Sequence, residues 1–264
     1  MRIISTDTGI FEKNIYRLGT IASTQDALKE LFQHGAAEGT IVIARGQTQG
    51  RGRRDKSWDS GEDMGLWMSV LLEPQGPEDS WSWVPLWAGI AARRALIGVL
   101  KDGSDFQPES IRLKWPNDIM MENRKLGGIL SERVQNRQNR QAVILGLGIN
   151  LLQTRSDFPP DIQEKAVSLF QVTNRIFAPD AVLNSVVANL DNLLPLLKPI
   201  RSDLIKEIWL QYAWGWERKL HLLSGTERIE GVFSDLGEHG EICLTVQDRG
   251  TIPFASAESI ELVL

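Results

Sequence analysis

The hydrophobic pattern of this chain changes once along its length, and that change constrains the fold more than any other feature of the sequence. Up to about residue 215, stretches with apolar residues at helical spacing alternate with short apolar runs of strand length. The helical stretches are 23–35, 83–100, 179–197 and 204–212, and the strand-like runs are 40–44, 66–72, 111–114, 129–134 and 142–150. We therefore predict an α+β domain over residues 1–215, in which helices flank a mixed β-sheet.

From residue 219 onward, the sequence consists of short alternating segments separated by turns that contain glycine. The segments are 219–223, 229–234, 241–246, 251–255 and 259–263. Segments of this length and spacing are typical of a small β-barrel. We expect residues 216–264 to form such a barrel as a second domain.

The composition excludes several classes of protein. The formal charge is −5, whereas a protein that grips a nucleic acid duplex needs a net basic face, so we expect no nucleic acid partner. The single cysteine, Cys243, has no internal disulfide partner, which favours a reducing compartment. The histidines His34, His221 and His239 lack metal-ligand spacing. The longest apolar run, Val84–Ala92, is far shorter than the ~20 residues that span a bilayer, so we expect a soluble, cytoplasmic protein.

A basic, glycine-rich segment follows the strand-like run at 40–44. In Gly50-Arg51-Gly52-Arg53-Arg54, the glycines allow close approach of a backbone to a ligand, and the arginines match phosphate or carboxylate oxygens. Gln47 supplies amide hydrogen bonds and Trp58 an apolar cover. Taken alone, the pattern fits a solvated loop or an RNA-contacting segment as well as a phosphate site. We expect residues 45–65 to form a long loop that becomes ordered on ligand binding.

Two further motifs place cations near backbone with little side-chain cover. In Lys114-Trp115-Pro116-Asn117-Asp118, the proline favours an extended residue before it, so a lysine and a carboxylate lie at one strand end. Lys125-Leu126-Gly127-Gly128 suits close approach of a carboxylate or an α-phosphate, although each motif by itself also fits an ordinary turn or hairpin. Gly146-Leu147-Gly148-Ile149-Asn150 lacks the third glycine of a dinucleotide fingerprint, and the chain has no P-loop motif.

In combination and in this order, these motifs resemble those of the biotin protein ligases, from about Tyr16 to the carboxyl end. The resemblance implies a fold like that of the class II aminoacyl-tRNA synthetases with a carboxyl-terminal SH3-like barrel. It also implies an enzyme that activates biotin with ATP and Mg²⁺ and transfers it to a lysine of a biotin carboxyl carrier protein. Only about a dozen residues precede the match, as in the group without an amino-terminal DNA-binding domain.

The resemblance also implies roles for individual residues. Ser23, Thr24 and Gln47 would hold the ureido ring of biotin. Residues 50–54 would close over biotin and adenylate together with Trp58. The remaining ligand-binding residues that it implies are Asn117, Lys125, Gly128, Gly146 and Asn150. Two departures stand out, because Gln25 replaces the commoner asparagine and Asp55-Lys56-Ser57 replaces glycine-arginine-lysine before the tryptophan.

The residues suggest how both half-reactions could proceed. A carboxylate with a pKa of about 4–5 is ionised at neutral pH and needs no general base to attack phosphorus. The obstacle is charge repulsion, which Arg51, Arg53, Lys125 and Mg²⁺ would relieve. The acceptor lysine amine is mostly protonated, so either Asp118 accepts its proton or the cations Lys114 and Lys125 lower its pKa.

Three alternatives remain open at this stage. Lipoate ligases and related acyltransferases share the implied fold, although the motifs favour biotin. A biotin-sensing transcriptional regulator is a second alternative, against which the acidic net charge speaks. A binding module without catalysis is the third. The residues do not distinguish a monomer from a homodimer.

Overall fold

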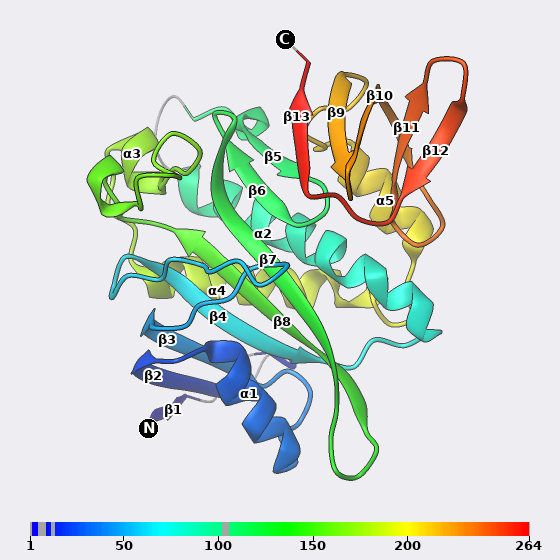
Figure 1. Cartoon of the computed structure of the whole chain (residues 1–264). Helices are drawn as coiled ribbons and strands as arrows, with labels where there is room; N and C mark the ends of the chain where they lie inside the picture. The colour runs from blue at the N-terminus through cyan, green and yellow to red at the C-terminus, as the bar shows by residue number, and fades with distance from the viewer. Residues whose placement is uncertain (1, 5–8, 12–13, 102–105, 264) are drawn as a thin grey trace.

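The structure is a computed structural model that describes residues 2–4, 9–11, 14–101 and 106–263. Its body is an eight-stranded sheet in the order β1-β2-β3-β4-β8-β7-β6-β5 (Figure 1). In chain order the strands are β1 (Arg2–Ile4), β2 (Ile15–Ile21), β3 (Ile41–Gln47), β4 (Gly65–Leu72), β5 (Ile111–Lys114), β6 (Asp118–Met121), β7 (Arg124–Gln135) and β8 (Gln141–Asn150). β2 and β3 are parallel, and every other neighbouring pair is antiparallel, so the predicted mixed sheet is confirmed.

The central strand β4 is buried on both faces, because helices cover the sheet from both sides. Leu66, Met68, Val70 and Leu72 belong to the larger core, together with α2 (Val84–Leu100) and α4 (Pro179–Leu193). Leu71 points the other way, into a smaller core beneath α1 (Thr24–Gln33). This alternation follows from the two-residue period of a strand. The sheet face beneath α1 also carries the candidate site.

Helix α1 begins and ends where the sequence predicts. The hydroxyl of Ser23 accepts a hydrogen bond from the backbone N–H of Asp26 at 3.4 Å, which satisfies one donor of the first turn. Leu28 and Phe32, one turn apart, are fully buried against the sheet. Gly35, just beyond the helix, has a φ of 92°, which favours glycine.

Helix α2 accounts for the most apolar part of the chain. Together with the 3₁₀ helix η1 (Glu78–Trp83), it is long and apolar enough to cross a membrane by length and composition. However, 72% of the most apolar window is buried inside the protein, as in a core helix. Trp83 and Trp87 are 1% and 0% exposed. Burial against the sheet and α4 thus explains the hydrophobicity of α2.

The carboxyl-terminal region forms a second, antiparallel sheet in the order β12-β11-β10-β9-β13 (Figure 1). Its strands, β9 (Lys219–Ser224), β10 (Glu227–Leu236), β11 (Ile242–Val246), β12 (Gly250–Phe254) and β13 (Ser259–Leu262), correspond to the predicted segments. The indole N–H groups of Trp83 and Trp115 donate to the carbonyls of Glu238 and Gly240, at 3.0 and 2.8 Å, in the turn between β10 and β11. These bonds tie the second sheet to the body.

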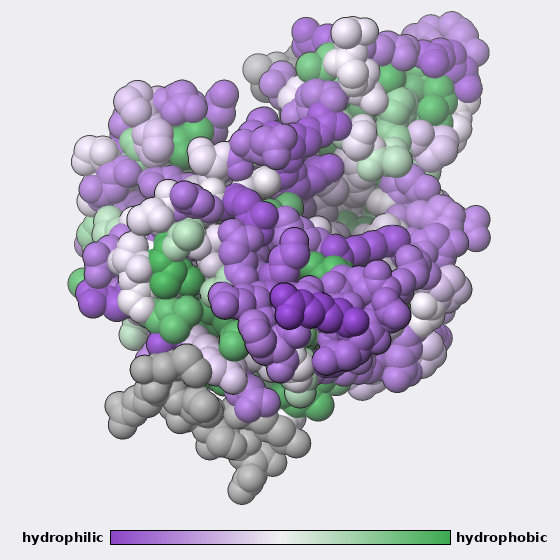
Figure 2. Space-filling view, turned by 60° about the horizontal axis from the view of Figure 1, so that its bottom comes forward, coloured by the Kyte–Doolittle hydropathy of each residue, from purple (hydrophilic) through white to green (hydrophobic). Residues whose placement is uncertain are grey.

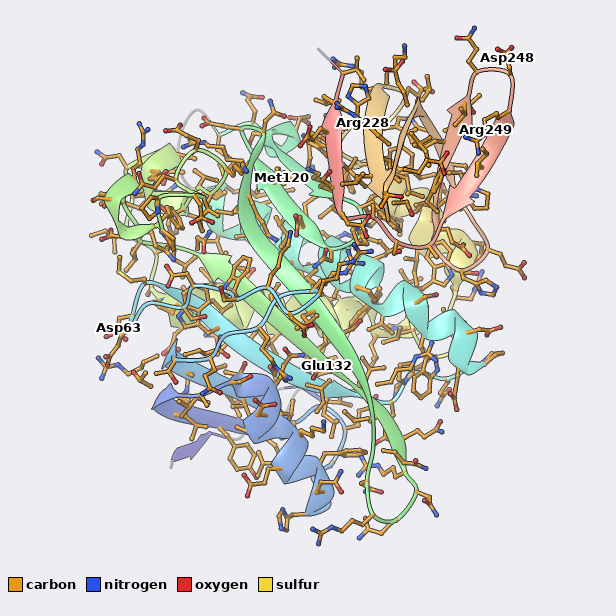
Figure 3. All side chains as sticks on the ribbon, viewed as in Figure 1. Asp63, Met120, Glu132, Arg228, Asp248 and Arg249 are labelled. Carbon is orange, nitrogen blue, oxygen red and sulfur yellow. The ribbon has the colours of Figure 1, made fainter. Side chains whose placement is uncertain are left out.

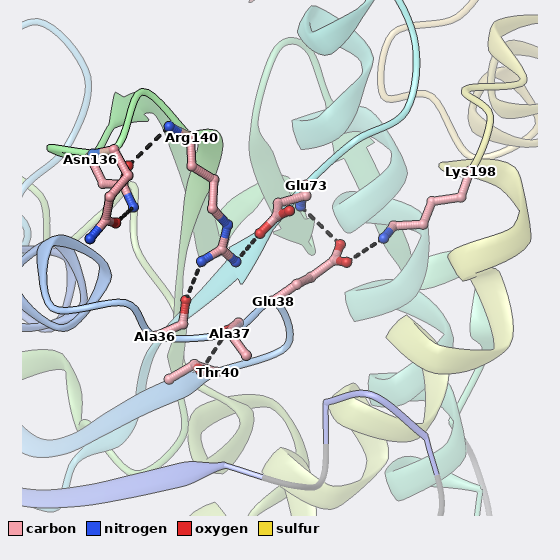
Figure 4. A network of polar contacts seen from close by, with 9 residues as sticks. Ala36, Ala37, Glu38, Thr40, Glu73, Asn136, Arg140 and Lys198 are labelled. Carbon is pink, nitrogen blue, oxygen red and sulfur yellow. Dashed lines mark hydrogen bonds and ion pairs between the residues drawn. The ribbon is translucent and has the colours of Figure 1, made fainter.

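The other end of the body carries a network of polar contacts (Figure 4). Arg140, which follows the turn between β7 and β8, donates to the Ala36 carbonyl at 2.8 Å and pairs with Glu73. Glu38 accepts from the backbone N–H of Glu73 at 2.9 Å and pairs with Lys198. The network therefore ties the β7–β8 turn and the α1–β3 connection to the segment before α5 (Ser202–Leu210).

Several elements differ from the sequence-based expectation. Strands β1, β2 and β6 and the short helix α3 (Leu169–Thr173) were not predicted. Helix α4 ends at Leu193 rather than residue 197, and the 3₁₀ helix η4 (Leu194–Leu196), which contains a proline, follows it. Two further 3₁₀ helices are η2 (Pro108–Ser110) and η3 (Arg155–Asp157). The expected loop starts later, because β3 extends to Gln47.

Candidate active site

A cavity of about 610 Å³ lies on the α1 face of the sheet, next to the amino-terminal end of α1. Its walls come from β7, β8, residues 51–59, residues 114–118, residues 158–166 and residues 257–261. Most of the predicted site residues line it, namely Thr24, Gln47, Arg51, Arg53, Arg54, Trp58, Lys114, Asn117, Asp118, Lys125, Gly128, Gly146 and Asn150. Ser23 and Gly50 were also predicted but are not among its lining residues.

Glycines on β7 and β8 form the floor of the cavity. A Cβ atom on Gly148 would lie 2.7 Å from the indole nitrogen of Trp58, and one on Gly128 would lie 3.1 Å from its ring. A Cβ atom on Gly146 would lie 3.0 Å from the amide carbon of Gln25. All three distances are shorter than a normal carbon contact of about 3.5–4.0 Å. The absence of side chains at these positions lets Trp58 and Gln25 rest directly on the sheet.

The basic loop is held to the body and to the second sheet by two of its arginines. Arg51 pairs with Asp26 at 2.9 Å and with Glu132 at 3.1 Å, from α1 and β7 respectively. Arg54 pairs with Glu258, just before β13. Figure 3 labels Glu132 on β7 and Met120 on β6, the second of which lines the cavity. The loop is also more regular than expected, because the backbones of Arg51 and Ser57 form an isolated antiparallel β-bridge.

Arg53 differs from these two arginines. Among the described residues, no side chain or carbonyl forms a hydrogen bond or an ion pair with its guanidinium group. Burial lowers the pKa of Arg53, the charge of Arg54 lowers it further, and Asp118 opposes the shift. Arginine remains charged at neutral pH regardless. Arg53 is therefore a half-buried cation at the cavity that is free to bind an anion.

Two lysines meet one carboxylate at the rim of the cavity. Lys125 Nζ lies 2.6 Å from Asp118 Oδ1 and 5.0 Å from the ring centroid of Trp58. Lys114 lies opposite Asp118 in the strand register of β5 and β6, and its Nζ lies 4.4 Å from the centroid of the Trp214 ring. Burial lowers the pKa of Lys114, Asp118 opposes this shift, and Lys125 adds to it. The cluster holds two cations and one carboxylate close together.

The amide side chains at the cavity form hydrogen bonds with other parts of the protein. The carbonyl oxygen of Gln47 accepts hydrogen bonds from the backbone N–H of Thr24 at 2.8 Å and from its hydroxyl at 3.1 Å. That hydroxyl also bonds Ser69 at 2.8 Å. Asn117 and Asn150 donate to the carbonyls of Ile129 and Val167, at 2.6 and 3.1 Å. Both asparagines thus fix backbone segments around the cavity.

Comparisons with known proteins decide the family. The sequence profile of the biotin/lipoate A/B protein ligase family matches residues 18–150. The bifunctional ligase/repressor of Bacillus subtilis is 31% identical over 256 residues, which cover 97% of this chain and 74% of that protein. The chain belongs to the biotin/lipoate A/B protein ligase family.

Two further family members support this assignment. The biotin–acetyl-CoA-carboxylase ligase of Mycobacterium tuberculosis is 26% identical, over 93% of this chain and 89% of that protein. The structure of the Aquifex aeolicus biotin protein ligase in complex with biotin and ATP superposes with a TM-score of 0.79 at 28% identity. The match covers 95% of this chain and all of that one. The sheet with its flanking helices is therefore the fold of a biotin protein ligase.

In this member of the ligase family, the cavity also includes residues that the sequence analysis missed. Phe158, Ile162 and Lys165 come from the segment after β8, while Glu258 lies just before β13 and Glu261 lies in it. None of them belongs to a motif, and only the fold brings them to the cavity. Gln25 also lines it, although the sequence marked it only as a departure from the family pattern.

Proposed function

We propose that this chain is a biotin–[biotin carboxyl carrier protein] ligase. It activates biotin with ATP to biotinyl-5′-AMP and transfers biotin to a specific lysine of the carrier protein of acetyl-CoA carboxylase. The observation that carries the proposal is the half-buried Arg53, which has no ion-pair partner in the part of the chain that the structure describes and lies in the same cavity as Lys125. Two cations beside a glycine floor suit an anion that must approach a polyanion. The names of the ligases from M. tuberculosis and A. aeolicus support the choice of biotin.

In the first half-reaction, the biotin carboxylate attacks the α-phosphorus of ATP, and pyrophosphate leaves. The carboxylate is already ionised, so the protein must supply positive charge rather than a base. Arg53 and Lys125 supply it in the cavity. Arg51 has a different part, because Asp26 and Glu132 already neutralise it and fix the loop. Arg54 holds the loop from the other side through Glu258.

In the second half-reaction, the amine of the carrier lysine attacks the mixed anhydride, and AMP leaves. The amine must first lose a proton. Asp118 can accept it when Lys125 turns toward the adenylate, and the positive field of Lys114 and Lys125 lowers the pKa of the incoming amine. Trp58 and the loop limit the access of water to the anhydride.

We also propose that Mg²⁺ binds together with ATP. Among the residues that the structure describes, no group of three or more His, Cys, Asp or Glu side chains is placed to hold a metal ion. A Mg²⁺ ion does not need such a group, because it usually binds to substrate phosphates and takes only one or two carboxylates from the protein. The carboxylates at the cavity are Asp59, Asp118, Glu164, Glu258 and Glu261. The ion would neutralise charge on the phosphates.

The proposal includes the arrangement of the chain. Residues 1–215 form the catalytic domain, and residues 216–264 form an SH3-like domain, a description supported by the five short antiparallel strands. Residues 257–261 bring this second domain to the cavity. We further propose a cytoplasmic enzyme, a monomer or homodimer, without a nucleic acid partner.

Mass spectrometry of a carrier domain tests the proposal. The purified protein, with biotin, ATP and Mg²⁺, should add one biotin to the acceptor lysine, whereas lipoate in a parallel reaction should add nothing. Replacing that lysine with arginine in the carrier provides the control. Labelling by lipoate and not by biotin would reassign the chain to the lipoate branch of the family.

A further inference from the structure

Gln25 is a buried polar residue at the cavity that the two half-reactions do not use. It is the second residue of α1, is 4% exposed and lines the cavity. Its amide carbon lies 3.0 Å from where a Cβ atom on Gly146 would stand, so the amide rests on the floor of the cavity. A buried amide needs hydrogen-bond partners for both its oxygen and its nitrogen.

The contacts of Gln25 fix the direction of its amide. The side-chain nitrogen donates to the Leu130 carbonyl at 3.3 Å. Because a carbonyl oxygen only accepts, the nitrogen must be on that side, and the oxygen of Gln25 must point away from Leu130. Among the described residues, none donates a hydrogen bond to this oxygen. A donor group on a ligand in the cavity can therefore form a hydrogen bond with this oxygen.

Gln47 offers the complementary group in the same cavity. Its carbonyl oxygen already accepts two hydrogen bonds from Thr24, and a backbone N–H can only donate, which fixes the direction of this amide too. Its nitrogen donates one hydrogen to Ser60 at 2.9 Å. The second hydrogen has no partner among the described residues. The cavity thus presents an acceptor on Gln25 and a donor on Gln47.

We infer that Gln25 accepts a hydrogen bond from a ring N–H of the bound ligand and thereby selects a cyclic urea. This inference rests on the proposed function and extends it to the recognition of the ring. A cyclic urea has an N–H beside a C=O, which matches the acceptor of Gln25 and the donor of Gln47. The dithiolane ring of lipoate has neither group, so its binding would leave the oxygen of Gln25 and the second hydrogen of Gln47 without a partner. Sites built to hydrogen-bond a substrate reject analogues that lack the group.

The chain offers a matched pair of variants for the test. Gln25→Met keeps the length and approximate volume of the side chain but removes the acceptor. Gln33→Met is the control, because Gln33 also lies on α1 and donates to a β7 carbonyl, that of Gln135, at 2.9 Å. Gln33 does not line the cavity. Both variants lose a link between α1 and β7, but only the first loses a ring contact.

Calorimetry with biotin should show that Gln25→Met binds roughly five- to tenfold more weakly than the wild type, the effect of one hydrogen bond. Gln33→Met should bind biotin like the wild type, and the KM for ATP should be unchanged in both. Equal biotin affinity in the wild type and a folded Gln25→Met would overturn the inference while leaving the proposed function intact. Failure of the wild type itself to bind biotin would remove the proposed function, and the inference with it.

Biotin methylated on either ring nitrogen gives a second test that needs no folded variant. The wild type should bind one of the two isomers more weakly than biotin, and Gln25→Met should lose much of that preference. Steric effects of the methyl group act in both proteins, so the difference between them isolates the hydrogen bond. Wild-type protein that binds both methylated isomers as tightly as biotin would refute the role of Gln25.

Discussion

Replacing Gly148 with alanine tests whether Trp58 rests on the glycine floor. The new Cβ would lie 2.7 Å from the indole nitrogen and 2.8 Å from an adjacent ring carbon, against about 3.5 Å for a favourable contact. Overpacking of this kind costs about 1–3 kcal/mol. Each kcal/mol corresponds to a change in Tm of about 2–4 °C for a chain of nearly this size. We therefore expect Gly148→Ala to lower the Tm by several degrees.

A double-mutant cycle shows whether Trp58 is the cause of that loss. In a Trp58→Ala background the ring is gone, so Gly148→Ala should cost less than about 0.5 kcal/mol, within the usual additivity error. Gly127→Ala is the matched control, since its Cβ would lie 2.7 Å from the backbone oxygen of Gly148. Its cost should be the same with and without Trp58.

Urea unfolding followed by far-ultraviolet circular dichroism suits this cycle, because removal of a tryptophan does not change the probe. The free energies of unfolding of the four proteins give the coupling between positions 58 and 148 directly. An equal cost of Gly148→Ala in both backgrounds would show that Trp58 does not lie on Gly148, and the account of the floor would be wrong.

Three further predictions concern the charged groups. Arg53→Ala should slow adenylate formation roughly 100-fold and release biotinyl-adenylate into solution. Chromatography of bound and free adenylate measures this release, and retention equal to that of the wild type would contradict the role of Arg53. Asp118→Asn should slow transfer to the carrier more than adenylate formation, and single-turnover kinetics that show equal losses in both steps would exclude Asp118 as the proton acceptor. Lys114→Met should be more stable than the wild type at pH 7. Burial lowers the pKa of Lys114 below its ordinary value of about 10.4, so the unfolded chain holds the proton more tightly than the folded protein does. This advantage should shrink as the pH rises through the lowered pKa toward about 10.4, and urea unfolding that gives the same difference at pH 7 and pH 10 would argue against a buried, charged Lys114.

The sequence predicted the elements whose hydrophobic period is strong and local. The ends of α1 and the strands of the second sheet followed from capping residues, alternation and glycines. Strand β2 was missed because only Ile15 is buried in it and its pairing with β3 is not local. Strand β6 was missed because its four residues, Asp118–Met121, are too short to show a period.

Most of the predicted motif residues line the cavity, but the motifs did not reveal that the arginines have different partners. The three arginines of the basic loop looked equivalent in sequence. Arg51 and Arg54 are paired with acids, and the partners Glu132 and Glu258 lie 81 and 204 residues away along the chain. Only the tertiary structure brings such distant residues together. The same holds for the free oxygen of Gln25, whose direction depends on the position of Leu130.

Biotin-dependent exchange of pyrophosphate into ATP tests the central claim most directly, because it reports adenylate formation without a carrier protein. The account predicts exchange that requires biotin and Mg²⁺, does not occur with lipoate and falls strongly in Lys125→Gln. Exchange that proceeds equally with lipoate, or none with biotin, would contradict it.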